Sequence, residues 1–286
     1  MNNNFRGLSH SWQLLILLLL SFGGILVSSA LQVLPLQVPV EVVLIAQDVF
    51  AFILPAIILA WLMAKGGWWK RMYLGKAPSA FALAMVVAVA LVSIPAMNWV
   101  TDWNSSVHLP QSMSGIEQAM RQAEDAAANM TKELLDCDNI PRLIVILMVV
   151  GVMAGLSEEM FFRGGILVTL LQRGHYHVMV WTTAIIFSAI HFQFFGFVPR
   201  MLLGAWFGYL MVWSRSLWVP VIAHTLNNSM AVVCSYMGHA GVNHMDAVDR
   251  IGVDSPWLAL ASAGATIALI VVAKQFFSKK IVENRQ

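Results

Sequence analysis

Two adjacent glutamates, Glu158 and Glu159, and an arginine, Arg163, interrupt a long apolar stretch of the sequence. Neighbouring residues on a helix point about 100° apart, so the two carboxylates cannot serve the same role. Glu159 and Arg163 are four residues apart and share a helix face, which favours a buried ion pair. Glu158 is then the carboxylate that remains for chemistry.

Three more polar residues stand in apolar segments: His191, four residues after Phe187, and His224 with Asn228, also four apart. A carboxylate can take a proton from water, histidines can orient that water or act as general acids, and Asn or His donors can stabilise an oxyanion. This set favours hydrolysis of an amide bond. The catalytic candidates are Glu158, His191, His224 and Asn228, with Glu159 and Arg163 as supporting residues.

A metal site is an alternative use of the same side chains. One glutamate and two histidines, here Glu158, His191 and His224, could hold zinc with one open position, and Asn228 could orient a histidine ligand. The sequence contains no HExxH pattern, the commonest signature of a zinc protease. The residues by themselves therefore leave zinc-bound and metal-free water as open alternatives.

The composition predicts the elements that must position these residues. Hydrophobic residues make up 59% and charged residues 11% of the 286 residues, unlike a soluble domain. Helix-length apolar runs, without the alternation of a barrel strand, predict an all-α fold: a polytopic transmembrane helical bundle of about eight spans. The expected spans are 11–33, 40–64, 79–99, 140–171, 177–194, 197–213, 217–237 and 256–277.

The basic residues predict the orientation. If the N-terminus is cytoplasmic, the cytoplasmic segments hold eleven of the 17 Lys and Arg residues, a positive-inside distribution. We therefore expect an integral protein of a bacterial inner membrane with both termini cytoplasmic, and we expect no nucleic-acid partner from a net charge of +2. The cytoplasmic set is Arg6, Lys65, Lys70, Arg71, Lys76, Arg173, Arg215, Lys274, Lys279, Lys280 and Arg285.

The sizeable polar segment is 101–139, with seven acidic and two basic residues. Its apolar residues recur every three to four positions, which predicts an amphipathic helix that Ser114 caps, that has Glu117 at its third position and that runs through Leu135. We interpret it as an acidic cap on the outer face of the bundle. Cys137 and Cys234 also fall near that face, where a disulfide could form.

Other residues in the apolar runs have structural interpretations. Asp48 is a second buried acid, which we interpret as a partner for Arg142 or Arg200. Gly151 and Gly155 form a small-xxx-small pair that lets two helices pack closely in lipid.

Three motifs in order, Glu-Glu-x-x-x-Arg at 158–163, Phe-x-x-x-His at 187–191 and His-x-x-x-Asn at 224–228, resemble those of the CPBP intramembrane protease family, also called Abi. That family includes CAAX-processing prenyl-protein endopeptidases and bacteriocin-maturation or immunity proteins. The resemblance covers 140–237 and implies a catalytic core there, within one integral membrane domain of residues 1–286. It implies that Glu158 activates water, that His191 helps to hold it, and that His224 with Asn228 supports the oxyanion or the water.

The leading hypothesis is an intramembrane endopeptidase whose partners are membrane lipid and a membrane-associated protein or peptide substrate. The resemblance leaves open whether zinc is required, because the family is commonly labelled metalloprotease while a metal-free water is also argued for it. One alternative is a non-proteolytic member, a scaffold or immunity factor. Another is a proton-coupled transporter that uses Asp48, Glu158 and the histidines, although no internal repeat is evident.

Overall fold

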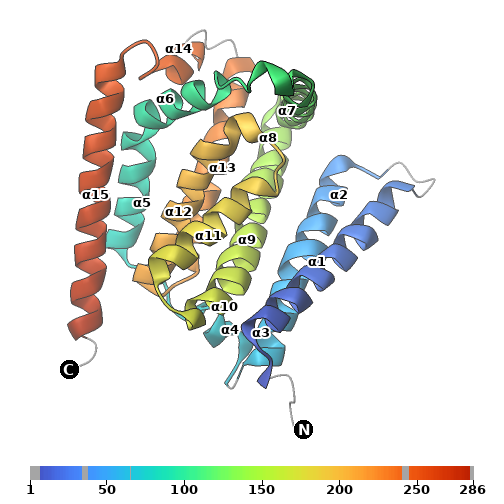
Figure 1. Ribbon diagram of the computed structural model, residues 1–286, viewed down its shortest axis with the longest axis vertical. Helices are drawn as coiled ribbons and strands as arrows, with labels where there is room; N and C mark the ends of the chain where they lie inside the picture. Colours follow the sequence, from blue (N-terminus) through green and yellow to red (C-terminus); the bar gives the residue numbers. More distant parts are fainter. Residues whose placement is uncertain (1–6, 34–37, 65, 240–244, 284–286) are drawn as a thin grey trace. The chain divides into compact units, whose positions relative to one another are not determined.

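The computed structural model describes residues 7–33, 38–64, 66–239 and 245–283, and the regular elements in these ranges are all helices (Figure 1). The predicted all-α fold is confirmed. Arg6, Lys65 and Arg285, which belong to the orientation argument, lie outside the described residues.

Within the described ranges, five helices are long and apolar enough to cross a membrane. Helices of this length and apolar composition match the hydrocarbon core of a bilayer, so the chain is an integral membrane protein. They are α1 (His10–Val33), the continuous helix Val40–Met63, the continuous helix Ile140–Leu170, Phe194–Ser214 with α12 (Phe197–Ser214), and Pro256–Ser278 in α15 (Pro256–Glu283).

A sixth span is possible where two helices meet at a bend. The predicted span 79–99 is divided into α5 (Ala80–Val92) and α6 (Ile94–Ser105), which are bent by 51°. Pro95 lies in the first turn of α6. Because proline lacks a backbone N–H and clashes with the preceding turn, it ends one helix and begins the next.

The two remaining predicted spans are helices that are not both long and apolar enough to count as clear membrane spans. The segment 177–194 is α11 (Tyr176–Ala189), with 14 residues, and Phe192 beyond its end has a left-handed φ of 55°. The segment 217–237 is α13 (Trp218–His239), which is 22 residues long but carries polar residues in its middle. Length and composition thus support five or six spans.

The chain divides into two compact units, each built from separate segments. The first comprises Met1–Pro78, Val145–Thr183 and Phe207–Ser229, and the second comprises Ser79–Ile144, Ala184–Trp206 and Met230–Gln286.

In the first unit, α1 packs along a second helix to form a hairpin (Figure 1). That second helix consists of α2 (Val40–Gln47), the π-helical segment η2 (Asp48–Ile53) and α3 (Leu54–Met63), with Pro55 directly after the widened turn. Gly24 of α1 lies so close to it that an added Cβ would overlap the Phe50 carbonyl.

From Val145 on, the helix that carries Glu158 belongs to the same unit, and it contacts η2 and α3. Its short α-helical part is flanked by π-helical turns, a feature frequent at functional sites. Its segments are α8 (Ile140–Ile146), η4 (Leu147–Met153), α9 (Ala154–Glu159), η5 (Met160–Leu167) and α10 (Val168–Leu170), followed by the 3₁₀ turn η6 (Leu171–Arg173). Between α3 and α5 stands the single-turn helix α4 (Trp68–Arg71).

In the second unit, α15 packs against α5 and α6. The Ser262 hydroxyl of α15 accepts a hydrogen bond from the Ala96 backbone N–H at 3.2 Å, directly after the bend at Pro95. The short helices are η3 (Gln111–Met113), η7 (Phe194–Gly196) and α14 (Met245–Arg250).

The amphipathic helix predicted in the acidic segment is confirmed as α7 (Ser114–Leu135), but the predicted cap is wrong. Ser114 is the first helical residue, and the helix begins without a side-chain cap. None of the α7 side chains is buried: Ile116 is 53% and Met130 71% exposed. Cys137 and Cys234 are both free thiols, so the disulfide considered above is absent.

Candidate active site

Two glycines let α13 approach the helix that carries Glu158. A Cβ added to Gly155 would lie 2.8 Å from Thr225 Oγ1 and 2.9 Å from its backbone nitrogen. At Gly151 it would lie 2.6 Å from Ser229 Oγ. The packing interpretation of the small-xxx-small pair is therefore confirmed, and this close approach explains why the polar residues of α13 reach the two glutamates.

Glu159 is the centre of a buried ion pair. Arg163 Nη1 donates to Glu159 Oε1 at 2.6 Å, and both side chains are fully buried. The predicted pairing is confirmed. A fully buried charge needs a partner of opposite sign, and Arg163 supplies it to Glu159. His224 Nδ1 lies 3.0 Å from the same carboxylate oxygen.

The bond to Glu159 shows which nitrogen of the His224 ring carries a hydrogen. A carboxylate oxygen only accepts, so Nδ1 carries the hydrogen and Nε2 of the neutral ring is an acceptor. Phe207 stacks on the imidazole with ring centres 4.9 Å apart, which holds its plane. The Nε2 atom then lies 3.8 Å from Glu158 Oε2.

Glu158 differs from its neighbour in what surrounds it. Its side chain is 19% exposed, against 0% for Glu159, while the buried Oε2 atom of each glutamate has no hydrogen-bond partner within the described residues. A separation of 3.8 Å from His224 Nε2 is too long for a direct hydrogen bond. Of the two glutamates, Glu158 is thus the one that is partly exposed, and its catalytic role stays a prediction.

Asn228 contacts the backbone of the Glu158 helix. Its Nδ2 donates to the Val150 carbonyl oxygen in η4 at 3.1 Å, and its Oδ1 accepts from Asn227 Nδ2 at 3.3 Å. These bonds hold α13 against a widened turn.

Asp48 and Ser157 form a contact that the sequence did not reveal. Ser157 Oγ donates to Asp48 Oδ1 at 2.7 Å, and it lies 3.1 Å from the Ala154 carbonyl oxygen. Asp48 is 8% and Ser157 0% exposed. Because Ser157 directly precedes Glu158, this bond ties the segment that carries Glu158 to η2. An acid inside an apolar run signals a need for a donor, but the sequence does not say which one.

His191 lies in the second unit, whereas the residues above belong to the first. It follows the end of α11 instead of standing inside a span, so its predicted placement is wrong in this respect. Its Nδ1 atom lies 2.8 Å from the Phe187 carbonyl oxygen, and the two rings meet edge to face with centres 5.2 Å apart. Since a carbonyl only accepts, Nδ1 carries the hydrogen and the neutral ring presents Nε2 as an acceptor.

A metal finds no ready ligand set in the part of the chain that the structure describes. No group of three or more His, Cys, Asp or Glu side chains there is placed to hold an ion. Glu159, the carboxylate nearest to Glu158 in sequence, is already bound to Arg163. Glu158 and His224 belong to the first unit and His191 to the second, so the zinc set considered above stays a prediction.

The motif-bearing part of the chain matches known proteins. The family model described as Type II CAAX prenyl endopeptidase Rce1-like matches residues 140–230. The uncharacterised protein YpbD of Bacillus subtilis (strain 168) is 28% identical over 99 residues. That alignment covers 33% of this chain and 46% of YpbD, so it spans less than half of the relative. No solved structure matches the chain.

Proposed function

The chain carries an Rce1-like domain of the CPBP family of CAAX proteases, and from this premise we propose that it is an intramembrane endopeptidase that hydrolyses a peptide bond of a membrane-associated protein or peptide. Glu158 is the general base. The observation that carries the proposal is that Glu158 Oε2, which has no hydrogen-bond partner within the described residues, lies 3.8 Å from His224 Nε2.

A water beside these two atoms can donate one hydrogen to Glu158 Oε2 and contact His224 Nε2. Glu158 then removes one proton while the oxygen of the water attacks the peptide carbonyl, so that a carbon–oxygen bond forms and the carbonyl becomes an oxyanion. The same proton can pass to the leaving amine as the carbon–nitrogen bond breaks. The overall change is addition of one water to the amide, giving a carboxylic acid and an amine.

The neighbours of Glu158 have distinct supporting roles. Arg163 neutralises Glu159, and Glu159 in turn fixes the His224 tautomer that presents Nε2 to the water. This state of the ring favours holding the water over donating to the oxyanion. His191 and Asn228 are the further motif residues, and we assign them to the water and to the oxyanion side respectively.

The membrane arrangement follows from the same proposal. Together with the five or six clear spans, α11 and α13 would complete a bundle of about eight, in one integral membrane domain with residues 140–237 as the catalytic core. The basic residues favour a bacterial inner membrane with both termini cytoplasmic.

The test compares cells that carry the native chain with cells that carry Glu158→Gln. The amide has the size of the carboxylate but cannot take a proton, so proteolysis should fall at least about a hundredfold. The measurement is mass spectrometry of membrane proteins and released peptides, with the amount of inserted protein determined in parallel.

Glu133→Gln is the matched control, because it makes the same chemical change at an exposed position of α7. It should leave the released peptides unchanged. If Glu158→Gln releases the same peptides as the native chain, the protease assignment is lost. A phenotype that persists without any cleavage favours the scaffold alternative, and coupled ion flux in proteoliposomes favours the transporter.

A further inference from the structure

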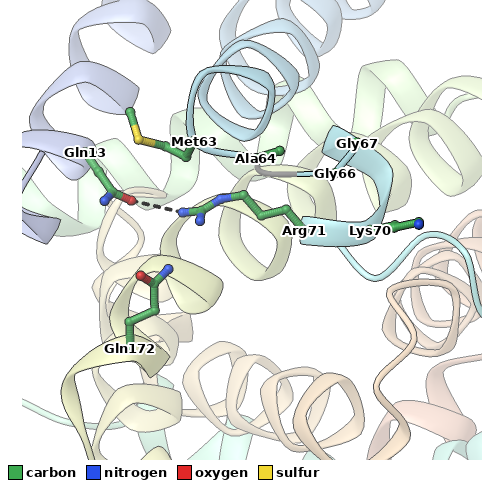
Figure 2. A pocket seen from close by; sticks show the side chains of 8 residues that line it. All are labelled: Gln13, Met63, Ala64, Gly66, Gly67, Lys70, Arg71 and Gln172. Atoms are coloured by element: carbon green, nitrogen blue, oxygen red, sulfur yellow. Dashed lines mark hydrogen bonds between the residues drawn. The ribbon is translucent and has the colours of Figure 1, made fainter. Parts of the chain in front are cut away.

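A pocket of about 550 Å³ lies in the first unit, at the end where α1 begins and where α3 and α10 end. Its lining includes Gln13, Met63, Arg71 and Gln172 (Figure 2). This volume falls in the range of small-molecule sites. Neither the catalytic motifs nor Asp48 contributes to the lining.

Arg71 reaches from α4 into this pocket and is held there by polar side chains (Figure 2). Its Nη2 atom donates to Gln13 Oε1 at 3.0 Å and lies 3.3 Å from Thr169 Oγ1. Gln13 is 5% and Thr169 0% exposed. Gln13 Nε2 donates to the Leu8 carbonyl oxygen at 3.0 Å, so the partner of Arg71 is itself fixed.

The guanidinium has unused binding capacity. Of its five N–H donors, the bonds to Gln13 and Thr169 engage only those on Nη2. No described carboxylate forms an ion pair with Arg71, and the pocket lining contains no acid. Partial burial also lowers the pKa of Arg71, because desolvation disfavours its charge. An anion in the pocket would supply the missing negative charge.

The surroundings favour a phosphate that a lipid presents. The pocket lies where apolar spans end, and Trp61 and Trp69 nearby in sequence are 65% and 46% exposed, as expected for aromatic residues at a membrane interface. Lys70 adds a second cation to the lining. An arginine fork binds two phosphate oxygens at once, and anionic headgroups concentrate at the cytoplasmic surface where basic residues gather.

We propose that this pocket binds the phosphate group of an anionic membrane lipid, with Arg71 as the principal ligand and Gln13 and Thr169 as its positioning residues. Lys70 strengthens the local positive charge, and Met63 offers an apolar wall for the part of the lipid next to the headgroup.

The experiment is a titration of the full-length protein in detergent with phosphatidylglycerol, in which native mass spectrometry counts the bound lipids. Phosphatidylcholine, which has the same phosphate but no net charge, is titrated in parallel. We expect tighter binding of phosphatidylglycerol, weakened about tenfold or more by Arg71→Gln. Lys274→Gln removes an exposed cation in α15 and is the matched control, expected to bind as the native protein does.

Lys70→Gln gives a second measurement, because it leaves the hydrogen bonds of Arg71 in place. A loss of about two- to threefold is expected from a rim charge, and it keeps the test decisive if Arg71→Gln fails to fold. Arg71-dependent binding of phosphatidylglycerol that is tighter than that of inorganic phosphate supports the lipid source. Arg71-dependent binding of inorganic phosphate without binding of phosphatidylglycerol would overturn the lipid assignment in favour of a soluble ligand. Equal lipid and phosphate binding by native protein, folded Arg71→Gln and Lys70→Gln would overturn the proposal.

Discussion

The protein contains two clusters of the same three residue types in different surroundings. The buried cluster, in the first unit, consists of Glu159, Arg163 and His224, whose side chains are 0%, 0% and 6% exposed. The exposed cluster, in the second unit, consists of Glu117, Arg121 and His108, at 13%, 35% and 75%. In both, glutamate and arginine are four residues apart on one helix and a histidine Nδ1 contacts the glutamate.

The two clusters differ in the further groups to which the arginine and the glutamate are hydrogen-bonded. In the exposed cluster, Arg121 Nη2 donates to the Val107 carbonyl oxygen at 2.9 Å, and Glu117 accepts from the Leu109 backbone N–H at 2.8 Å. These bonds fold a loop onto the start of α7. In the buried cluster the pair fixes an imidazole beside Glu158. The same spacing thus indicates an ion pair, and only burial decides what the pair controls.

Removing the arginine of the buried cluster should have the largest effect on stability. Arg163→Leu leaves the Glu159 charge in an apolar interior, and the loss should be about 3–5 kcal/mol. The unfolding midpoint in detergent measures it. The double variant Glu159→Leu with Arg163→Leu is the control and should recover much of the loss, because it leaves no unpaired charge. A single variant as stable as the native protein would show that the buried cluster behaves like the exposed one.

Replacing one glycine tests the packing that assembles the buried cluster. In Gly155→Ala the new methyl would meet the Thr225 backbone, so α13 must shift, at a cost of about 1–3 kcal/mol. Peptide release should fall with it. The control is Gly115→Ala, two residues before Glu117, where an added Cβ meets nothing within 4 Å. Equal stability of the two variants would mean that the close approach of α13 does not matter.

Acid should open the exposed cluster. Hydrogen bonds from the Leu109 N–H, then from His108 and Arg121, lower the pKa of Glu117 from 4.5 to about 2. A carboxylate with a depressed folded-state pKa stabilises the fold fully above its ordinary value, and that contribution is lost as pH falls from 4.5 toward 2. Protection of the Leu109 amide from hydrogen exchange, corrected for intrinsic rate, should fall over this window. In Glu117→Gln the protection should show no such dependence.

The smallest effect is expected from the arginine of the exposed cluster. Arg121→Leu should destabilise the protein roughly five times less than Arg163→Leu, because a solvated ion pair contributes little. High salt should reduce the difference between Arg121→Leu and native protein further, while the effect of Arg163→Leu should persist. Unfolding midpoints at low and high salt give both results. A large, salt-insensitive loss at Arg121 would place its importance in the stacking on Phe195, whose ring centre is 4.0 Å away.

The sequence predicted what depends on local spacing. The pair Glu159–Arg163 follows from four-residue periodicity, and the range of α7 follows from its apolar repeat. Contacts between distant residues were not predictable in this way: Ser157 and Asp48 are 109 positions apart, and their pairing depends on how η2 lies against α9. The bend at Pro95 was not predicted either, because the apolar run has the same composition whether its helix is straight or broken.

The residues at which helices begin and end could also not be predicted from sequence patterns alone. Serine is a common cap, yet Ser114 is the first residue of the helix, and Glu117 accepts from the Leu109 N–H of the preceding loop. The π-helical turns around α9 add a residue to each turn and shift which side chains share a face. No sequence pattern marks such turns, so the direction in which Glu158 points could not be predicted from the sequence.

The hydrogen bond from Asn228 to the Val150 carbonyl bears on how mutants of this protein should be interpreted. An apolar residue at this position would remove that hydrogen bond as well as the amide that we assign to the oxyanion side. An inactive Asn228 variant would therefore be ambiguous between lost chemistry and a displaced helix. Only a replacement that can still donate to the same carbonyl separates the two meanings.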